Sequence, residues 1–250
     1  MANNQMEAPG PEGAPDWDSL YLYRGDEVEL GRPVFTGDVY FDVEVQGVGA
    51  IERKNVLVLQ HPCALRTDGI HLTDSLMVAE VITDRFYEER DWNGNYKLMP
   101  LPYLAGEDED NLQHHSALFT SLYLVIPASL DPAKRTASMS LPGVNLLLQR
   151  WVYHNSRALV PTWKYSEVTS GPYEEADGIE EWCSFRIPKG LTVEQAWVEA
   201  TEWLDDKSDI GIPRRAHLEN PQFRPNVRKK MRAAARALPP PPSRKNRGRD

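Results

Sequence analysis

The chain contains 250 residues, of which 41% are hydrophobic, and it carries a formal net charge of -9. This length and composition suit one large core or two small ones, and no run approaches the roughly 18 apolar residues of a membrane-spanning helix. The N-terminal residues lack the basic start and apolar stretch of a targeting segment, so we expect a cytoplasmic protein outside the membrane. Two cysteines, Cys63 and Cys183, cannot build a disulfide framework or a zinc site alone.

Short β-strands are predicted for the first half of the chain. Residues 1–16 are rich in Pro, Gly, Glu and Asn, and this composition predicts disorder. Apolar and polar residues alternate from Val39 to Val45, as they do in a half-buried strand. Continuous apolar runs at Val56–Leu59 and Leu76–Ile82 have the length of buried strands.

Turn and strand signals continue towards the middle of the chain. The step Asn93–Gly94 is a hairpin signal, and Ser121–Leu130 is predicted as a strand closed by Pro127. Several short strands between turn signals indicate a small barrel or sandwich. We therefore expect a β-domain at residues 17–139, either a barrel or a sandwich.

Helical periodicity begins where these strands end. Pro142 suits a first helical turn, and apolar residues follow at helical spacing from Val144 to Val152. Three basic residues recur on the same helix at steps of four and three and form a second stripe beside the apolar one. They are Arg150, His154 and Arg157, which are candidate contacts for RNA phosphates or form an exposed polar face opposite the buried one, and we favour the polar face.

A further strand and helix are predicted downstream. The segment Glu180–Pro188 is predicted as a strand, and Thr192 and Gln195 form a capping box at the start of another helix. These elements predict an α/β extension at residues 140–222 that packs on the preceding β-domain. The fold class is therefore α+β.

The C-terminal segment carries a charge opposite to that of the preceding chain. Arg224–Asp250 contains ten Lys or Arg and one acid, whereas the rest contains 18 basic and 36 acidic groups. Within residues 223–250 we predict a helix at Asn226–Leu238, followed by four prolines and a disordered tail. Such a basic arm can bind nucleic-acid phosphates or an acidic partner, serve as a solubilising tail, or fold against its own acidic body. The first alternative makes candidate nucleic-acid contacts of Arg228, Lys229, Lys230 and Arg232.

His61 and Cys63 follow the apolar run Val56–Leu59. A Cys–His pair can form an activated thiolate, as in a cysteine-dependent hydrolase. The structural alternative is a buried cysteine beside a strand-end histidine, and we favour it because unpaired cysteines are among the most buried residues. The sequence has no Walker loop, no dinucleotide glycine pattern and no histidines at metal-ligand spacing. We therefore expect no metal and no cofactor.

Four segments occur in the order seen in one toxin family. They are GDVYF at Gly37–Phe41, GVG at Gly47–Gly49, KNVLVLQ at Lys54–Gln60 and LMVAEVIT at Leu76–Thr83. Over about residues 32–127 the chain thereby resembles MazF/PemK-like toxins. The resemblance implies a small SH3-like β-barrel, commonly a dimer, that cleaves single-stranded RNA without a metal.

The resemblance also implies a set of catalytic residues. It places the family's catalytic arginine at Lys54, with Arg53 adjacent, and its catalytic threonine at Thr83. A cation at this place stabilises the negative charge that develops on phosphoryl oxygens when a ribose 2′-OH attacks the phosphate. Thr83 would orient a phosphate oxygen, and Arg53 and His61 are the candidates for acid–base help.

The chain departs from the family at one important step. The family's Arg-Pro is Lys54-Asn55 here, and an ammonium meets a phosphate as a point charge where a guanidinium binds it bidentately. Either a change of register re-aims Arg53, or the activity is weakened or lost.

Two hypotheses about function follow. The first is a MazF/PemK-like metal-independent endoribonuclease, or a degenerate relative, of toxin–antitoxin or defence type. Its partners would be single-stranded RNA, an antitoxin or other protein, and a second copy in a homodimer. The second is a non-catalytic SH3-like protein that binds nucleic acid or a protein through its basic arm. The acidic body argues against the first, because its phosphate-binding surface would have to be local.

Overall fold

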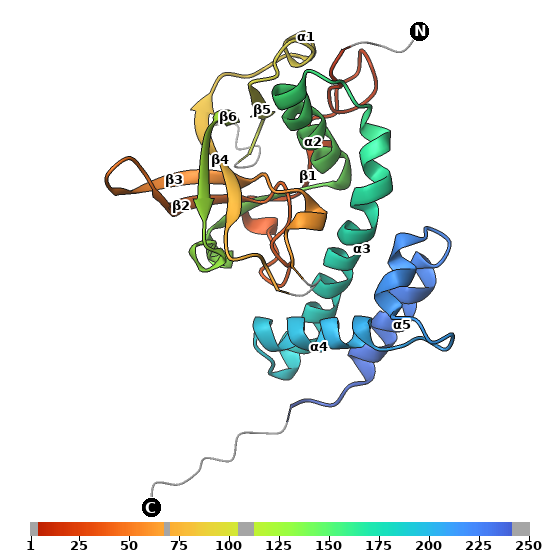
Figure 1. Cartoon of the computed structure of the whole chain (residues 1–250). Coiled ribbons are helices and arrows are strands. Elements are labelled where there is room, and N and C mark those ends of the chain that lie inside the picture. The colour runs from red at the N-terminus through yellow and green to blue at the C-terminus, as the bar shows by residue number, and fades with distance from the viewer. Residues whose placement is uncertain (1–4, 68–70, 105–112, 242–250) are drawn as a thin grey trace, which may run out of the picture. The chain divides into compact units, whose positions relative to one another are not determined.

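The computed structural model of the chain describes residues 5–67, 71–104 and 113–241 (Figure 1). The chain divides into two compact units, which we describe separately. The sheet unit comprises Met1–Glu29 and Val34–Tyr173, and the helical unit comprises Leu30–Pro33 and Glu174–Asp250. The boundaries of these units differ from the expected divisions at residues 139/140 and 222/223.

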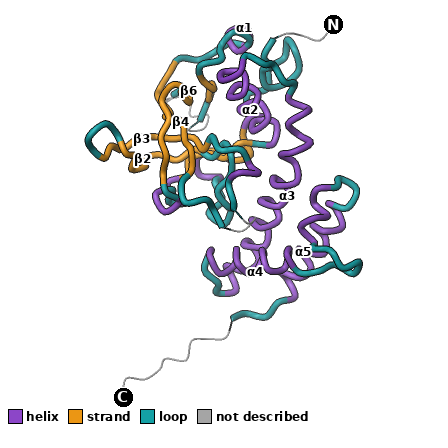
Figure 2. Tube along the Cα trace, in the orientation of Figure 1, coloured by secondary structure: helices purple, strands orange, loops and turns teal. Residues whose placement is uncertain are grey.

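The sheet unit is built on seven antiparallel strands in the order β1-β7-β2-β3-β4-β6-β5. Figure 2 shows these strands in orange. Their bounds are β1 Tyr21–Arg24, β2 Val39–Gln46, β3 Ile51–Val58, β4 Leu76–Asp84, β5 Leu98–Leu101, β6 His114–Val125 and β7 Arg135–Met139. The order begins at β1 and ends at β5, so the hydrogen-bonded sheet is not closed into a barrel. The α+β class is confirmed.

The predicted strands around the centre of the sheet are confirmed. The alternating segment forms β2, and the two apolar runs form the buried parts of β3 and β4, where Val56 to Leu59 have no exposed surface. The segment predicted as Ser121–Leu130 contains the end of the longer strand β6. The central strands bury both faces, so these runs lack strict alternation.

Helices α2 (Leu141–Ser156) and the first part of α3 (Thr162–Arg186) complete the sheet unit (Figure 1). Ser140 caps α2 by accepting a hydrogen bond from the Gly143 amide at 3.1 Å, and Pro142 lies in the first turn as predicted. A Cβ atom at Gly143 would lie 2.2 Å from the Leu20 carbonyl oxygen, so this helix start approaches the chain so closely that only glycine fits.

Helices α4 (Val193–Asp205) and α5 (Arg224–Ala237) belong to the helical unit together with the end of α3. Both helices were predicted, and the capping box between Thr192 and Gln195 is present. Their apolar faces share one core with the end of α3. It contains Ile179, Trp182, Cys183, Ala196, Ala200, Leu204, Leu218, Val227, Met231 and Ala235.

Two predictions of secondary structure are wrong. Glu180–Pro188 is not a strand, because Glu180 to Arg186 belong to α3, whose residues Ile179, Trp182 and Cys183 recur at the three- and four-residue steps of a helix. Asn93–Gly94 is not a hairpin turn, because it follows the short helix α1 (Glu89–Trp92).

The N-terminal prediction is wrong for the residues that can be described. Within residues 5–16, Met6 is buried, and Glu7 receives hydrogen bonds from Thr162 and Gln149. Contacts with distant helices therefore order a segment that composition alone marks as disordered. Residues 1–4 and the predicted tail at residues 242–250 lie outside the described residues.

Candidate functional site

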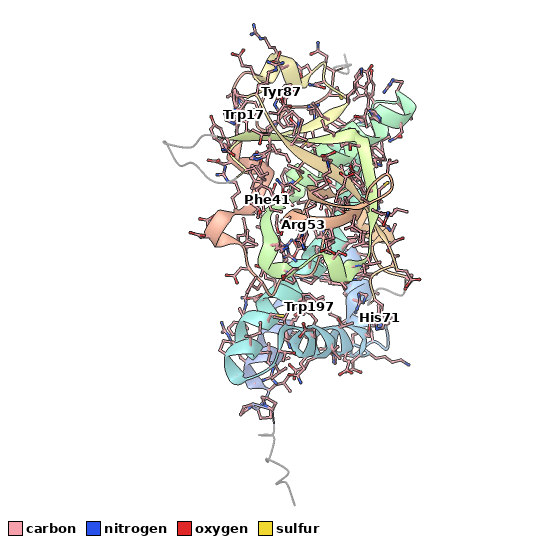
Figure 3. All side chains as sticks on the ribbon, turned by 90° about the vertical axis from the view of Figure 1, so that its left-hand side faces the viewer. Trp17, Phe41, Arg53, His71, Tyr87 and Trp197 are labelled. Atoms are coloured by element: carbon pink, nitrogen blue, oxygen red, sulfur yellow. The ribbon has the colours of Figure 1, made fainter. Side chains whose placement is uncertain are left out.

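Arg53 lies on β3 and is held by two carboxylates. Its guanidinium donates to Asp42 Oδ2 at 2.8 Å and to Glu44 Oε1 at 2.7 Å. The side chain is 54% exposed, and Figure 3 shows it on the side of the molecule formed by the β2–β3 hairpin. A shallow cavity of about 270 Å³ includes Arg53, its two acidic partners and Lys134.

Asp42 organises this group of charges. It lies at a bulge of β2, where the register shifts between Tyr40 and Val43, and its φ of 55° is in the left-handed region. Lys134 Nζ donates to its carboxylate at 2.7 Å. This hydrogen bond, with the Arg53 charge, lowers the pKa of Asp42. We call Asp42, Glu44, Arg53 and Lys134 the bulge cluster.

Lys54 also forms ion pairs with two carboxylates, and these differ from the two that hold Arg53. Its ammonium lies 3.0 Å from Glu80 Oε1 and 3.2 Å from Glu52 Oε2, and the hydrogen bond with Glu80 raises the pKa of Lys54. Burial tends to raise the pKa of Glu80, but hydrogen bonds from Ser121 and Lys54 outweigh it and leave that pKa below its usual value.

Thr83 lies on the face of the sheet opposite to Lys54. Glu80 and Thr83 are three residues apart on β4, and side chains alternate faces along a strand. Since Lys54 contacts Glu80, it shares a face with Glu80 and not with Thr83. Thr83 is exposed and pairs in register with His115 on β6.

Arg53 does not reach Thr83 either. The ladder between β3 and β4 ends at the pair Asn55–Val81. Beyond it the β2–β3 hairpin extends away from the end of β4, as Figure 1 shows. The structure therefore brings neither predicted cation together with the threonine.

His61 lies beyond the opposite end of β3, roughly 20 Å along the chain from Lys54 at about 3.3 Å per residue. It caps the 3₁₀ helix Pro62–Ala64, and its Nδ1 accepts a hydrogen bond from the Cys63 amide at 3.2 Å. Burial lowers the pKa of His61. His61 is thus a turn-capping residue, far from the other three.

The two cysteines lie in different surroundings. Cys63 is exposed, contrary to the buried cysteine that we favoured, and its Sγ lies 3.7 Å from the Val168 carbonyl oxygen. Cys183 is buried in the core of the helical unit, and burial raises its pKa to about 12. No disulfide joins them.

The basic stripe on α2 turns inward. Arg150 has no exposed surface, and its guanidinium donates to the carbonyl oxygens of Asn95, Trp92 and Glu7 at 2.6, 3.0 and 3.0 Å. Burial lowers its pKa to about 9. Neither alternative for the stripe, an RNA contact or an exposed polar face, describes Arg150 in this conformation, because its side chain has no exposed surface.

The other two residues of the stripe close the end of α2. His154 Nδ1 lies 3.0 Å from the Tyr96 carbonyl oxygen, and its ring stacks on Trp151. Arg157 ends the helix in the left-handed region and donates to the Tyr153 and His154 carbonyl oxygens. Both are therefore occupied in capping and packing.

The basic face of α5 pairs with the acidic end of α3. Arg228 lies 3.2 Å from Glu174 and 3.4 Å from Glu181, and Arg232 also contacts Glu181. Lys230 lies 3.1 Å from Asp209. Lys229 is exposed and forms no ion pair with the described residues. Of the four alternatives for the basic arm, folding against its own acidic body describes this helix.

Two features were missed because their residues are scattered in sequence. Trp17, Phe86, Tyr103 and His114 form a half-buried aromatic cluster, with ring centroids 5.0 to 5.9 Å apart. Figure 3 labels Trp17, one member of this cluster. A cavity of about 450 Å³ in the helical unit is the second. No spacing in the sequence indicates either, since each is assembled from separate elements.

The described residues contain neither a candidate membrane-spanning helix nor a candidate metal site. There, no helix has the length and apolar character needed to cross a membrane. Within the same residues, no group of three or more His, Cys, Asp or Glu side chains could hold a metal ion.

Two comparisons with known proteins found no match for this chain. No protein-family model matches it, and no curated protein sequence matches it.

Proposed function

We propose that the chain is a non-catalytic binding protein whose sheet unit docks a protein partner, in the first place a second copy of itself. The observation that carries the proposal is an exposed apolar row at the end of β6. It consists of Leu122, Leu124 and Ile126, which are 39%, 66% and 59% exposed. An apolar patch of this kind with a polar rim is typical of a protein-binding surface.

The edge of β6 adds to the docking surface. β5 pairs with β6 only from His115 to Leu118, so beyond Phe119 the only strand that pairs with β6 in the described part of the chain is β4. An open edge offers backbone donors and acceptors to another strand. Antiparallel pairing of this edge with itself would give a two-fold dimer.

Charges beside the apolar row favour a second copy as the partner. Ile126 lines the same cavity as the bulge cluster, which contains two acids and two bases. A two-fold axis brings identical patches together, and a patch with both signs of charge can complement itself. A purely basic or purely acidic rim would repel its copy.

We further propose that the sheet unit is an open, SH3-like barrel and a degenerate relative of the MazF/PemK-like toxins. β2 and β6 are separated by two strands, which in a flat sheet would hold them roughly 14 Å apart. The Phe41 and His115 rings are nevertheless 5.8 Å apart, so the sheet curls strongly. This curvature supports the proposal.

The experiment is a measurement of mass in solution by light scattering on the full chain. We expect a dimer for the wild type and a monomer for Leu124→Asp, because a carboxylate would be buried without a partner in the interface. Val48→Asp is the matched control: Val48 is 104% exposed in the β2–β3 loop, and this variant should remain dimeric. A monomeric wild type, or a dimer that survives Leu124→Asp, would overturn the proposal.

The second candidate is the metal-independent endoribonuclease acting on single-stranded RNA, with the basic arm adding salt-dependent affinity. The exposure of Arg53 beside a second cation, Lys134, favours it. Because Arg53 and Lys54 are each neutralised by two carboxylates, we expect no cleavage of single-stranded RNA in EDTA. Cleavage that Arg53→Ala, Lys54→Ala or Thr83→Ala abolishes without unfolding would establish this candidate instead.

A further inference from the structure

The helical unit contains a cavity of about 450 Å³, within the 300–1,000 Å³ that is usual for small-molecule sites. Its walls come from the end of α4, the loop after it and the start of α5. The residues that matter here are Trp203, Asp209, Ile210, His217, Phe223 and Lys230. The proposed role of the sheet unit does not involve this cavity.

Trp203 provides one fixed aromatic wall. The Arg214 guanidinium carbon lies 4.5 Å from the centre of the Trp203 ring, and Arg214 also donates to the Trp203 carbonyl oxygen at 2.7 Å. On the core side, the Trp182 ring is 5.9 Å away. These contacts hold the indole in place before any ligand arrives, so little ordering is needed on binding.

Phe223 provides a second wall. Its ring meets His217 edge to face at 5.4 Å, and His217 Nε2 lies 3.1 Å from Ser208 Oγ, which orients the imidazole. Phe223 is 47% exposed and Ile210 is 73% exposed. Apolar side chains left open around a cavity favour a flat apolar ligand that covers them.

The charges at the rim favour an anion. Lys230 lies 3.1 Å from Asp209, but their side chains are 52% and 91% exposed, and an ion pair so open to water contributes little. Lys230 can therefore exchange Asp209 for a ligand anion at small cost. Arg214 also lines the cavity, but it pairs with Asp206 at 3.0 Å, so Lys230 is the lining cation that we assign to a ligand anion.

We propose that this cavity binds a small planar aromatic carboxylic acid. The ring lies between Trp203 and Phe223, and the carboxylate pairs with Lys230. A carboxylate on an ammonium is a charge-assisted contact, which is stronger than a contact between neutral groups.

The test uses three probes that share one ring and differ in charge: indole-3-acetate, indole-3-acetamide and tryptamine. Each is titrated into the full chain while the indole N–H signal of Trp203 is followed by NMR, with Trp203→Phe identifying that signal. We expect indole-3-acetate to shift the signal and to bind about tenfold more tightly than the amide, with tryptamine weakest.

Two adjacent lysines supply the matched variants. Lys230→Ala should reduce the affinity for indole-3-acetate to that for the amide, whereas Lys229→Ala, on the exposed neighbour, should leave it unchanged. Phe223→Ala should weaken all three probes, and the remaining NMR signals report whether each variant is folded. No shift of Trp203 with any probe up to about 1 mM, equal affinity for the three, or an equal loss in both lysine variants would overturn the proposal.

Discussion

At the scale of single residues, the partners of a charged side chain determine what it can do. Arg53 and Lys54 are adjacent, yet each is held by a different pair of carboxylates. A cation that stabilises a transition state must be directed at the developing charge. Before either residue could act on a phosphate, its ion pairs with two carboxylates would have to break.

The contribution of the Lys54–Glu80 contact to the free energy of unfolding can be measured through its pH dependence. Hydrogen bonds in the folded protein lower the pKa of Glu80 below its value in the unfolded chain. The ionised carboxylate therefore stabilises the folded protein when the pH is above the unfolded pKa. This stabilisation is lost as the pH falls through the folded pKa. At pH 7 we expect Glu80→Gln to reduce the free energy of unfolding by about 1–2 kcal/mol. The difference from wild type should shrink below about pH 4.5.

Urea unfolding followed by tryptophan fluorescence between pH 7 and pH 3 measures this difference. Glu52→Gln is the control, because Glu52 also contacts Lys54 but is 44% exposed and should have the smaller effect. A Glu80→Gln effect that is the same at every pH would contradict the assignment.

At the scale of elements, α5 shows that a basic helix need not be a binding arm. Its apolar residues Val227, Met231 and Ala235 face the core, and Arg228 and Arg232 beside them meet the acids of α3. Burial of one face thus directs the flanking cations to the helix that lies alongside. Charge along the sequence could not reveal this pairing, because the acids are about fifty residues earlier in the chain.

Neighbouring residues of α5 allow a direct test. Arg228→Ala removes contacts with Glu174, Asp177 and Glu181 and should lower the stability of the helical unit by about 1 kcal/mol at low salt. Because salt screens such pairs, the loss should be smaller in 0.5 M salt.

Lys229→Ala should change stability by less than about 0.5 kcal/mol at either salt concentration. Amide hydrogen exchange in α5 gives the local free energy of opening in each variant. Equal effects of the two substitutions would show that the ion pairs do not stabilise the helix.

At the scale of the whole molecule, the two units carry different candidate sites. The sheet unit has the apolar row and the bulge cluster, and the helical unit has the aromatic cavity. Each site is formed inside one unit. A partner of the sheet and a ligand of the helices can therefore be examined by separate variants in the same full chain.

The sequence by itself determined the local elements whose signals are short-range. Alternation predicted β2, apolar runs predicted β3 and β4, and the Thr192–Gln195 capping box predicted the start of α4. Such signals depend on residues a few positions apart. They failed at Glu180–Pro188, where an aromatic-rich segment joins a helical core that residues from α4, α5 and the segment between them complete.

Only the tertiary structure decided which side chains meet. The divergence of β3 from β4 separated Arg53 from Thr83, strand alternation put Lys54 on the other face, and packing buried Arg150. The N-terminal segment with Met6 and Glu7 gained its order from distant helices. These outcomes depend on strand register and long-range packing, which are set by contacts between residues far apart in the chain.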